Sequence, residues 1–363
     1  MIGALIFNII AVIFAWLEST GQYKHGLKLS LFTVFLFLAL RYSYGNDYWN
    51  YFYMFMDTNS SSSFGESILR EGWEIGWLFI NRVFGLLGTQ GFFAMIAVLA
   101  AFNCIVLFRF IKKYVPPKHY WIAVFIYTFQ PDMMLILSSA MRQAVAVSLF
   151  LLSIDFIIQK KILPYLILVT IATIFHTSSI VLYTFILLVF GDWKINFREL
   201  IIVFVLFMIQ FIYFNVIHEY TTLITNKYFW AYTKHLSEAP DLEVVFRLRA
   251  ALAIFIYTTC IYLSQKETNN TNNLFYKIAI IAILMFPLSN VAGNFARLNY
   301  YLLPVFMVVF SVTAIKIKNR EFRLIFIGSI LTLNLYQFFL FFQSVIWQYY
   351  FAEYHTIFSS PYF

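Results

Sequence analysis

Arginine, carboxylate and histidine side chains beside apolar stretches are the residues of this sequence whose types could support chemistry. The cationic candidates are Arg41, Arg142, Arg247 and Arg297, and the candidate proton acceptors are Asp47, Glu74 and His176. A guanidinium can bind phosphate oxygens through two parallel hydrogen bonds and keeps its charge when partly desolvated. A carboxylate or an imidazole can take the proton of an attacking hydroxyl, which contributes about 10²- to 10⁴-fold in rate. Brought together, these residues would suit a lipid-linked pyrophosphate that leaves as a sugar hydroxyl attacks.

The same residues also have ordinary structural interpretations. An arginine at a helix end can extend its charged head to the membrane surface while its stem stays in an apolar environment. Asp47 follows a helix-breaking Gly45-Asn46 pair and could simply cap a helix that begins at Tyr48. His176 could be a hydrogen-bonded structural residue at a break between two helices. Among the proton acceptors, the sequence does not select one.

Composition indicates the class of protein. Of 363 residues, 62% are hydrophobic and only 12% are charged, which excludes a soluble globular domain and predicts an all-α, polytopic integral membrane protein. The net charge of +8 comes from basic residues scattered over short loops, so we expect no nucleic-acid partner. Cys104 and Cys260 lie in apolar runs and predict neither a disulfide nor a metal site. We find no DxD or HExxH motif and no close histidine pair, so we expect no metal and no cofactor.

The positions of lysines and arginines predict a topology, because short cytoplasmic loops collect these residues. With the basic clusters inside, the chain has about 10–12 membrane segments in a single membrane-embedded domain, residues 1–363. These segments are 1–17, 29–43, 91–111, 119–138, 140–159, two short ones within 162–190, 199–217, 246–264, 274–290, 298–315 and 323–343. The segment 119–138 is interrupted at Gln130-Pro131-Asp132, and the region 162–190 is divided around His176.

Besides the N-terminus and the tail 343–363, two loops are expected on the outer, periplasmic side in this topology. Residues 44–90 form one loop, in which a helix from Tyr48 and an amphipathic stretch around Glu74 are predicted to be interfacial or re-entrant. Residues 218–245 form the other loop. Most lysines then lie inside, whereas seven of the arginines lie outside. An outer recess with Arg41, Arg142, Arg247 and Arg297 is the predicted site.

Several short motifs resemble the EpsG family, which belongs with the Wzy-type O-antigen and exopolysaccharide polymerases. In chain order they are Arg41-x3-Gly45-x-Asp47-Tyr48-x2-Tyr51, Glu74 in its amphipathic stretch, Arg142-Gln143-Ala144, Ala172-x3-His176-x-Ser178-Ser179, and Arg297-x2-Tyr300-Tyr301 with Pro304. The resemblance runs over most of the chain.

The resemblance implies a glycosyltransferase of GT-C-like architecture in a bacterial inner membrane. Such an enzyme moves a growing glycan from undecaprenyl pyrophosphate to the non-reducing end of the next lipid-linked repeat unit on the periplasmic face. Arginines would bind the pyrophosphate, and aromatic faces such as those of Tyr48 and Tyr300 would suit sugar rings. The partners would be the two lipid-linked oligosaccharides, the bilayer and a membrane protein that regulates chain length.

Two other functions fit the composition. A membrane-bound O-acyltransferase also has many helices and an intramembrane histidine, but it needs access to a cytoplasmic thioester, whereas His176 is predicted to face outward. A flippase or other transporter of lipid-linked oligosaccharides would show an inverted repeat and charges near the membrane midplane, and we find neither. The sugar, the linkage, retention or inversion, the oligomeric state, and O-antigen versus capsule or exopolysaccharide stay open.

Overall fold

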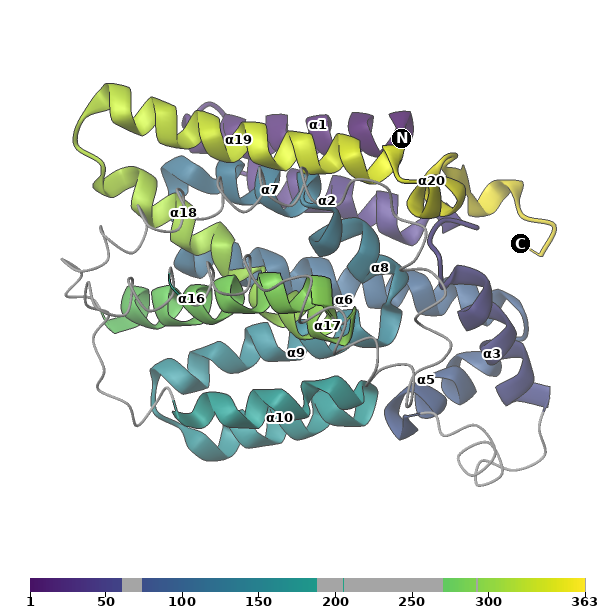
Figure 1. Ribbon diagram of the computed structural model, residues 1–363. Helices are drawn as coiled ribbons and strands as arrows, with labels where there is room; N and C mark the ends of the chain where they lie inside the picture. The colour runs from purple at the N-terminus through teal and green to yellow at the C-terminus, as the bar shows by residue number, and fades with distance from the viewer. Residues whose placement is uncertain (61–73, 188–204, 206–269, 292, 363) are drawn as a thin grey trace. The chain divides into compact units, whose positions relative to one another are not determined.

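A computed structural model describes residues 1–60, 74–187, 205, 270–291 and 293–362, and the described chain is mostly α-helical (Figure 1). It divides into two compact units, residues 1–190 together with 334–363, and residues 191–333. The predicted spans 199–217 and 246–264, the predicted loop 218–245, and Arg247 lie outside the described residues, as does the part 61–73 of the predicted loop 44–90. The predicted all-α membrane fold agrees with what is described.

Helices that are adjacent in the chain and helices that are far apart in it pack together in the first unit. They are α1 (Ile2–Ser19), α2 (Gly26–Ala39), α3 (Tyr48–Ser60), α5 (Ile75–Gly85), α6 (Gln90–Tyr114), η1 (Pro117–His119), α7 (Tyr120–Phe129), η2 (Asp132–Ile136), α8 (Leu137–Ser139), α9 (Met141–Ile158), α10 (Ile162–Phe175), η3 (Thr177–Ile186), the end of α19 (Arg320–Gln343), α20 (Val345–Phe351) and η4 (Ile357–Ser359). In this unit α1 packs on α2 and α7, and α6 packs on α2 and α9. Helix α10 packs on α9, and α10 also contacts α5.

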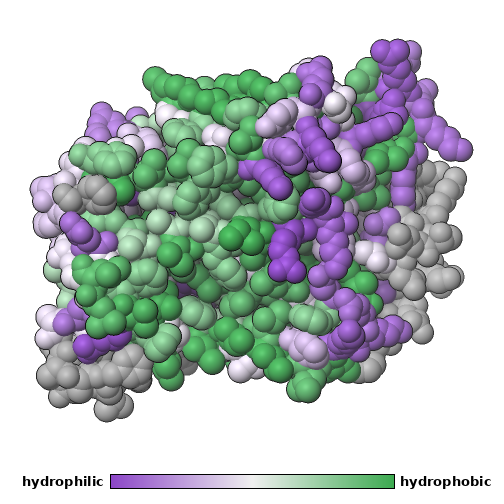
Figure 2. Space-filling model, turned by 180° about the vertical axis from the view of Figure 1, so that it is seen from behind, coloured by the Kyte–Doolittle hydropathy of each residue, from purple (hydrophilic) through white to green (hydrophobic). Residues whose placement is uncertain are grey.

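Four helices of the described chain are long and apolar enough to cross a membrane, namely α1, α6, α9 and α19. A fifth crossing is possible if Pro117–Phe129 and Asp132–Ser139, which are bent by 68°, form one broken span. This bend confirms the predicted interruption at Gln130-Pro131-Asp132, where proline removes a helical hydrogen bond. Hydrophobic side chains dominate a broad area of the molecular surface in Figure 2, as expected of a protein that lies in a membrane.

The tail of the chain pairs with the segment that follows α2. The strands β1 (Arg41–Tyr42) and β2 (His355–Thr356) are antiparallel, a feature that the sequence did not suggest. The Tyr354 ring stacks on Phe37 with 4.6 Å between centroids, and its hydroxyl donates a hydrogen bond to the Phe37 carbonyl at 2.7 Å. Gly45 adopts a φ of 125°, which a residue with a Cβ rarely takes. The tail thus fixes the turn that leads into α3.

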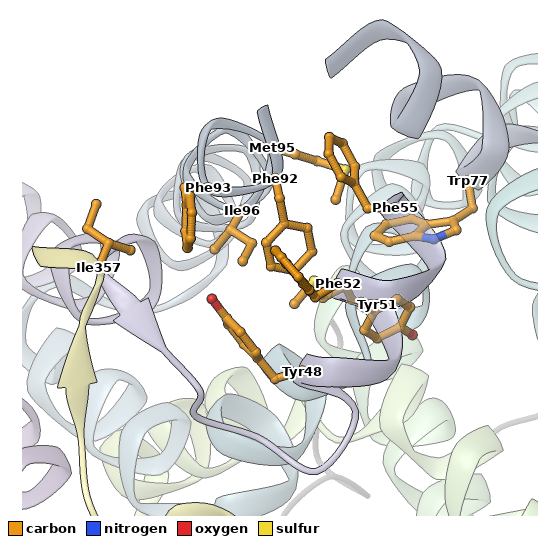
Figure 3. Packing of buried hydrophobic residues seen from close by; sticks show 11 residues of the cluster. Tyr48, Tyr51, Phe52, Phe55, Trp77, Phe92, Phe93, Met95, Ile96 and Ile357 are labelled. Atoms are coloured by element: carbon orange, nitrogen blue, oxygen red, sulfur yellow. The ribbon is translucent and has the colours of Figure 1, made fainter. Parts of the chain in front are cut away.

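An aromatic cluster joins α3, α5 and α6 (Figure 3). Tyr48, Phe52 and Phe55 from α3 meet Phe92 from α6, and all four are at least 95% buried. The ring centroids of Phe52 and Phe92 lie 5.2 Å apart at an interplanar angle of 84°, the edge-to-face geometry that aromatic pairs prefer. Trp77 extends the cluster into α5. The aromatic residues after Arg41 therefore fix α3 and α5 against each other.

The second unit contains α16 (Asn270–Val291), α17 (Gly293–Leu302), α18 (Val305–Lys316) and the start of α19. Within it, α16 packs on both α17 and α18. The predicted segment 298–315 is divided in the structure, because α17 ends at Leu302 and α18 begins at Val305. Pro304 stands at the N-cap of α18, where its missing N–H and its ring interrupt a continuous helix.

Candidate functional site

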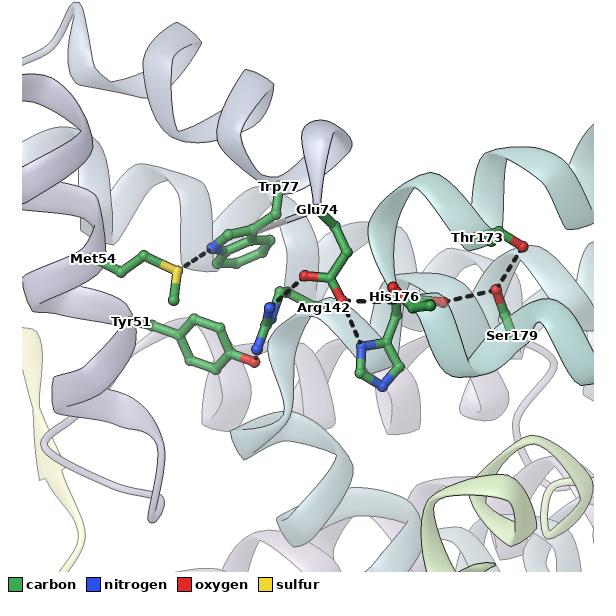
Figure 4. Close-up of polar contacts among 9 residues, drawn as sticks. Tyr51, Met54, Glu74, Trp77, Arg142, Thr173, His176 and Ser179 are labelled. Atoms are coloured by element: carbon green, nitrogen blue, oxygen red, sulfur yellow. Dashed lines mark hydrogen bonds and ion pairs between the residues drawn. The ribbon is translucent and has the colours of Figure 1, made fainter. Parts of the chain in front are cut away.

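Three of the predicted functional side chains meet in the first unit, and a tyrosine joins them. Glu74 precedes α5, Arg142 lies in the first turn of α9, His176 separates α10 from η3, and Tyr51 comes from α3. Figure 4 shows the four side chains pointing toward one another, and we call them the Glu74 cluster. Glu74 and His176 are nearly enclosed, with side chains 13% and 12% exposed, whereas Arg142 is 25% exposed. The cluster thus brings a carboxyl group, an imidazole and a guanidinium together at a site that is only partly exposed to solvent.

Arg142 occupies a position where helix physics disfavours a cation. The preceding Ala140 has the non-helical angles φ −82° and ψ 65°, so α9 starts only at Met141. The N-terminus of a helix is its positive end, and a cation there costs roughly 0.3–1 kcal/mol. The guanidinium is held by an ion pair with Glu74, by donation from Nε to the Tyr51 hydroxyl at 3.4 Å and by the Tyr51 ring, whose centroid is 5.7 Å from Cζ. The helix end and the guanidinium together present positive charge.

Glu74 is the centre of the cluster. It stands at the N-cap of α5, but its carboxylate makes no capping bond to that helix. The carboxylate instead pairs with Arg142, accepts a hydrogen bond from the Thr177 backbone N–H at 3.4 Å, and lies 3.3 Å from His176 Nδ1. Burial alone would raise the pKa of Glu74, but the hydrogen bond with His176 and the charge of Arg142 lower it to about 2. At neutral pH Glu74 is therefore an anion and a weak base.

His176 is held in an extended conformation, with φ −155° and ψ 114°, between α10 and η3. Ser179 fixes this junction, because its hydroxyl donates to the His176 carbonyl at 2.8 Å. Nδ1 faces the Glu74 carboxylate, which favours the tautomer with its proton on Nδ1. Both ring nitrogens are buried; Nδ1 has Glu74 at 3.3 Å, outside strict hydrogen-bond geometry, and Nε2 has no hydrogen-bond partner among the described residues. A role of His176 as a base stays a prediction.

A close approach of two helices holds Glu74 beside His176. A Cβ on Gly76 would lie 2.9 Å from Ile174 Cγ2 and 3.1 Å from the Ile174 carbonyl oxygen. These distances are shorter than ordinary carbon contacts, so only glycine lets the first turn of α5 pack this tightly on α10. The geometry of the acid and the imidazole therefore depends on a residue that takes no part in the chemistry.

Asp47 and Arg41 have other partners. Asp47 is half-buried directly before α3, its backbone N–H donates to Ser139 Oγ at 3.0 Å, and Oδ1 accepts a hydrogen bond from the Asn46 amide at 3.2 Å. Arg41 is 4% exposed, and its guanidinium donates to the carbonyls of Leu38 and Ser138 at 2.6 and 2.9 Å. A role of either side chain in catalysis or substrate binding stays a prediction.

Of the remaining predicted substrate contacts, Tyr48, Arg297 and Tyr300 lie among the described residues. Tyr48 is 1% exposed and belongs to the aromatic cluster of Figure 3. Arg297, which is exposed, and Tyr300, which is half-buried, both lie on α17 of the second unit. Arg247 lies outside the described residues. For these four residues, substrate binding stays a prediction.

Two further residues contribute to this region: Tyr51, which the sequence offered only as the last residue of a motif and without a role, and Ser139, which it did not single out. Tyr51 accepts a hydrogen bond from Arg142, and burial raises its pKa, so its hydroxyl keeps a proton that it can donate. Ser139 links α8 to the turn before α3 through Asn46 Oδ1 at 2.8 Å. The available signal for Tyr51 was its place in a tyrosine-rich stretch three residues after Tyr48. Such a stretch does not tell which ring will meet a cation.

Comparison with known proteins gives one family and no individual relative. No curated protein and no solved structure matches the chain. The family model described as the EpsG family matches residues 27–356, a range that contains the whole Glu74 cluster. Because the match covers most of the sequence, the chain belongs to the EpsG family, a family of Wzy-like polysaccharide polymerases.

Proposed function

We propose that this protein elongates a bacterial polysaccharide by transferring a growing glycan from undecaprenyl pyrophosphate to the non-reducing-end sugar of another lipid-linked repeat unit. The reaction takes place on the periplasmic face of the inner membrane, in a GT-C-like architecture and without a metal. One observation carries the proposal: a single carboxylate, Glu74, contacts both a guanidinium and an imidazole. This pairing supplies the base and the positive charge that the reaction requires.

His176 is the general base. Its Nε2 takes the proton from the acceptor hydroxyl as that oxygen forms a bond to the anomeric carbon of the donor glycan. Glu74 stays ionised because its pKa is about 2, so it holds the Nδ1 proton and stabilises the imidazolium that forms. A carboxylate has the same function toward the histidine in the serine-histidine-aspartate triad. Glu74 is therefore a positioning residue.

Arg142 stabilises the leaving group. The bond between the anomeric carbon and the pyrophosphate oxygen breaks, and the electron pair goes to the pyrophosphate, which stays on its lipid. The guanidinium and the N-terminus of α9 place positive charge where this negative charge develops. Tyr51 holds Arg142 in place from α3. Arg41, Arg247, Arg297, Tyr48 and Tyr300 are further proposed contacts of the pyrophosphate and the sugars, and a membrane protein that sets chain length is a proposed partner.

The test is chain extension by the purified protein with a synthetic lipid-pyrophosphate repeat unit. Wild type should form a ladder of longer glycans that is insensitive to EDTA, and Arg142→Ala and His176→Gln should lose it. The matched control is His355→Gln, because His355 Nε2 also lies 3.3 Å from a glutamate, Glu353, but on the surface with side chains 50% and 80% exposed. This variant should extend chains like wild type.

Two outcomes would contradict the proposal. No ladder from folded wild type with its cognate substrate would exclude a polymerase, and acyl transfer and lipid flipping would then be assayed. A ladder that persists in both Arg142→Ala and His176→Gln would leave the polymerase assignment intact but would exclude the Glu74 cluster as its site.

A further inference from the structure

A cavity lies at the end of α9 opposite Arg142. It has a volume of about 290 Å³ and is bounded by the last turns of α6 and α9, two helices that pack together. Asp155 in this cavity is 13 positions after Arg142 on α9, so the two ends are separated by about 20 Å at 1.5 Å per residue. The volume is near the lower end of the range for small-molecule sites, roughly 300–1,000 Å³.

The lining of this cavity combines excess positive charge with apolar walls. Arg109, Lys112 and Lys113 contribute three cations, and Asp155 contributes one carboxylate. Asp155 is already paired with Lys113, 2.7 Å from its Nζ, and with the Tyr114 hydroxyl. Arg109 and Lys112 are exposed and make no ion pair with any described carboxylate. Both cations can pair with an external anion, although Lys112 Nζ already lies 5.4 Å from the centroid of the Phe108 ring.

An apolar stripe on α6 leads to these cations. Val98 and Ile105 are 52% and 59% exposed, and Lys112 follows at the same spacing of seven residues. Residues seven apart lie on nearly the same face of an α-helix. An acyl chain along Val98 and Ile105 would therefore bring its headgroup to Arg109 and Lys112. The lysine-rich ends of α6 and α9 are those that the topology predicts to be cytoplasmic, where the membrane surface is negative.

We propose that this cavity binds the headgroup of an anionic glycerophospholipid of the cytoplasmic leaflet. Arg109 and Lys112 contact the phosphate, the Lys113–Asp155 pair forms the polar side of the cavity, and Val106, Leu151 and Leu152 contact the glycerol and the first methylenes. The site is separate from the Glu74 cluster, and it does not depend on the proposed polymerase activity. A bound headgroup would contact the C-terminal ends of both α6 and α9.

The test uses purified full-length protein and native mass spectrometry with added dioleoyl phosphatidylglycerol, dioleoyl phosphatidylcholine or a polyprenyl phosphate. We expect phosphatidylglycerol to bind more tightly than phosphatidylcholine. Arg109→Gln and Lys112→Gln should each lower the affinity for phosphatidylglycerol about fivefold, and the double variant should lower it about thirtyfold, because each cation near a lipid phosphate contributes roughly 1 kcal/mol. Leu152→Trp, which fills the cavity at constant charge, should lower this affinity as well.

Lys118→Gln is the matched control, because Lys118 is exposed on η1 and does not line the cavity. Cations near a helix C-terminus also stabilise that helix, so melting temperatures are compared to show that each variant is folded. Equal affinity for phosphatidylglycerol and phosphatidylcholine would overturn the proposal. So would an equal loss in Lys118→Gln, or binding of the polyprenyl phosphate alone.

Discussion

Replacing Glu74 by glutamine should reveal how much the carboxylate contributes to the Glu74 cluster. The pKa of Glu74 is about 2, against an ordinary value of 4.5, and a shift of this size corresponds to about 3 kcal/mol of interaction with the charged form. Because the pKa is lowered in the folded protein, this stabilisation is fully present above about pH 4.5 and is lost as the pH falls through about 2. At neutral pH, the glutamine side chain of Glu74→Gln lacks this stabilisation.

The same variant should lose both catalytic rate and thermal stability. An amide cannot stabilise the imidazolium and does not select the tautomer with its proton on Nδ1, so Glu74→Gln should lower kcat about 100-fold. The melting temperature should fall by about 5 °C in the same variant. Since Glu74 acts through His176, the double variant Glu74→Gln/His176→Gln should be no slower than His176→Gln alone.

The assay measures initial rates of chain extension from a fixed concentration of repeat unit, with the melting temperature in detergent from intrinsic fluorescence. Glu353→Gln is the control, because Glu353 makes a contact of the same length with His355 on the surface and should change neither quantity. A folded Glu74→Gln protein with kcat within threefold of wild type would refute the role of Glu74. Additive losses in the double variant would refute its action through His176.

Three further predictions concern the parts that hold the site. Arg142→Lys keeps the charge but loses the planar fork, so chain extension should fall at least about tenfold; unchanged rates would show that charge alone suffices. Gly76→Ala should lower kcat about 10- to 100-fold by moving α5 from α10, whereas Gly328→Ala, where a Cβ meets nothing within 4 Å, should be neutral; equal rates of the two variants would contradict the close-approach argument. Tyr354→Phe removes the 2.7 Å hydrogen bond to Phe37 and should lower the free energy of unfolding by about 1 kcal/mol in a denaturant titration, and an unchanged midpoint would argue against the tail fixing the turn.

Local signals predicted most of the described helices. The break at Gln130-Pro131-Asp132 and the division at His176 were both confirmed, because proline and a polar interruption act within a few residues of themselves. The break between α17 and α18 was missed, although Pro304 was part of a quoted motif. The apolar run around Pro304 was read as one segment, and hydropathy alone does not register a helix end inside an apolar run.

Long-range pairings could not be predicted in the same way. Strand β2 pairs with β1 although more than 300 residues separate them in the chain, and two-residue strands carry no periodic pattern. The tail that forms β2 was expected only to lie on the outer side of the membrane, with no partner in the chain. Its stacking of Tyr354 on Phe37 depends on how α2 and the chain end are packed.

The sequence by itself determined that this is a helical membrane protein with arginines, carboxylates and a histidine beside its helices, because composition and hydrophobic runs decide where a chain can lie relative to a bilayer. The tertiary structure decided which of those residues meet. Glu74, Arg142 and His176 lie on three elements separated by 68 and 34 positions in the chain, and only the packing of α5, α9 and α10 brings them together. It also gave the candidate bases different surroundings, since the contact with His176 and the charge of Arg142 lower the pKa of Glu74, whereas Nε2 of His176 has no hydrogen-bond partner among the described residues. Such surroundings depend on distance and burial, which residue types and spacing do not specify.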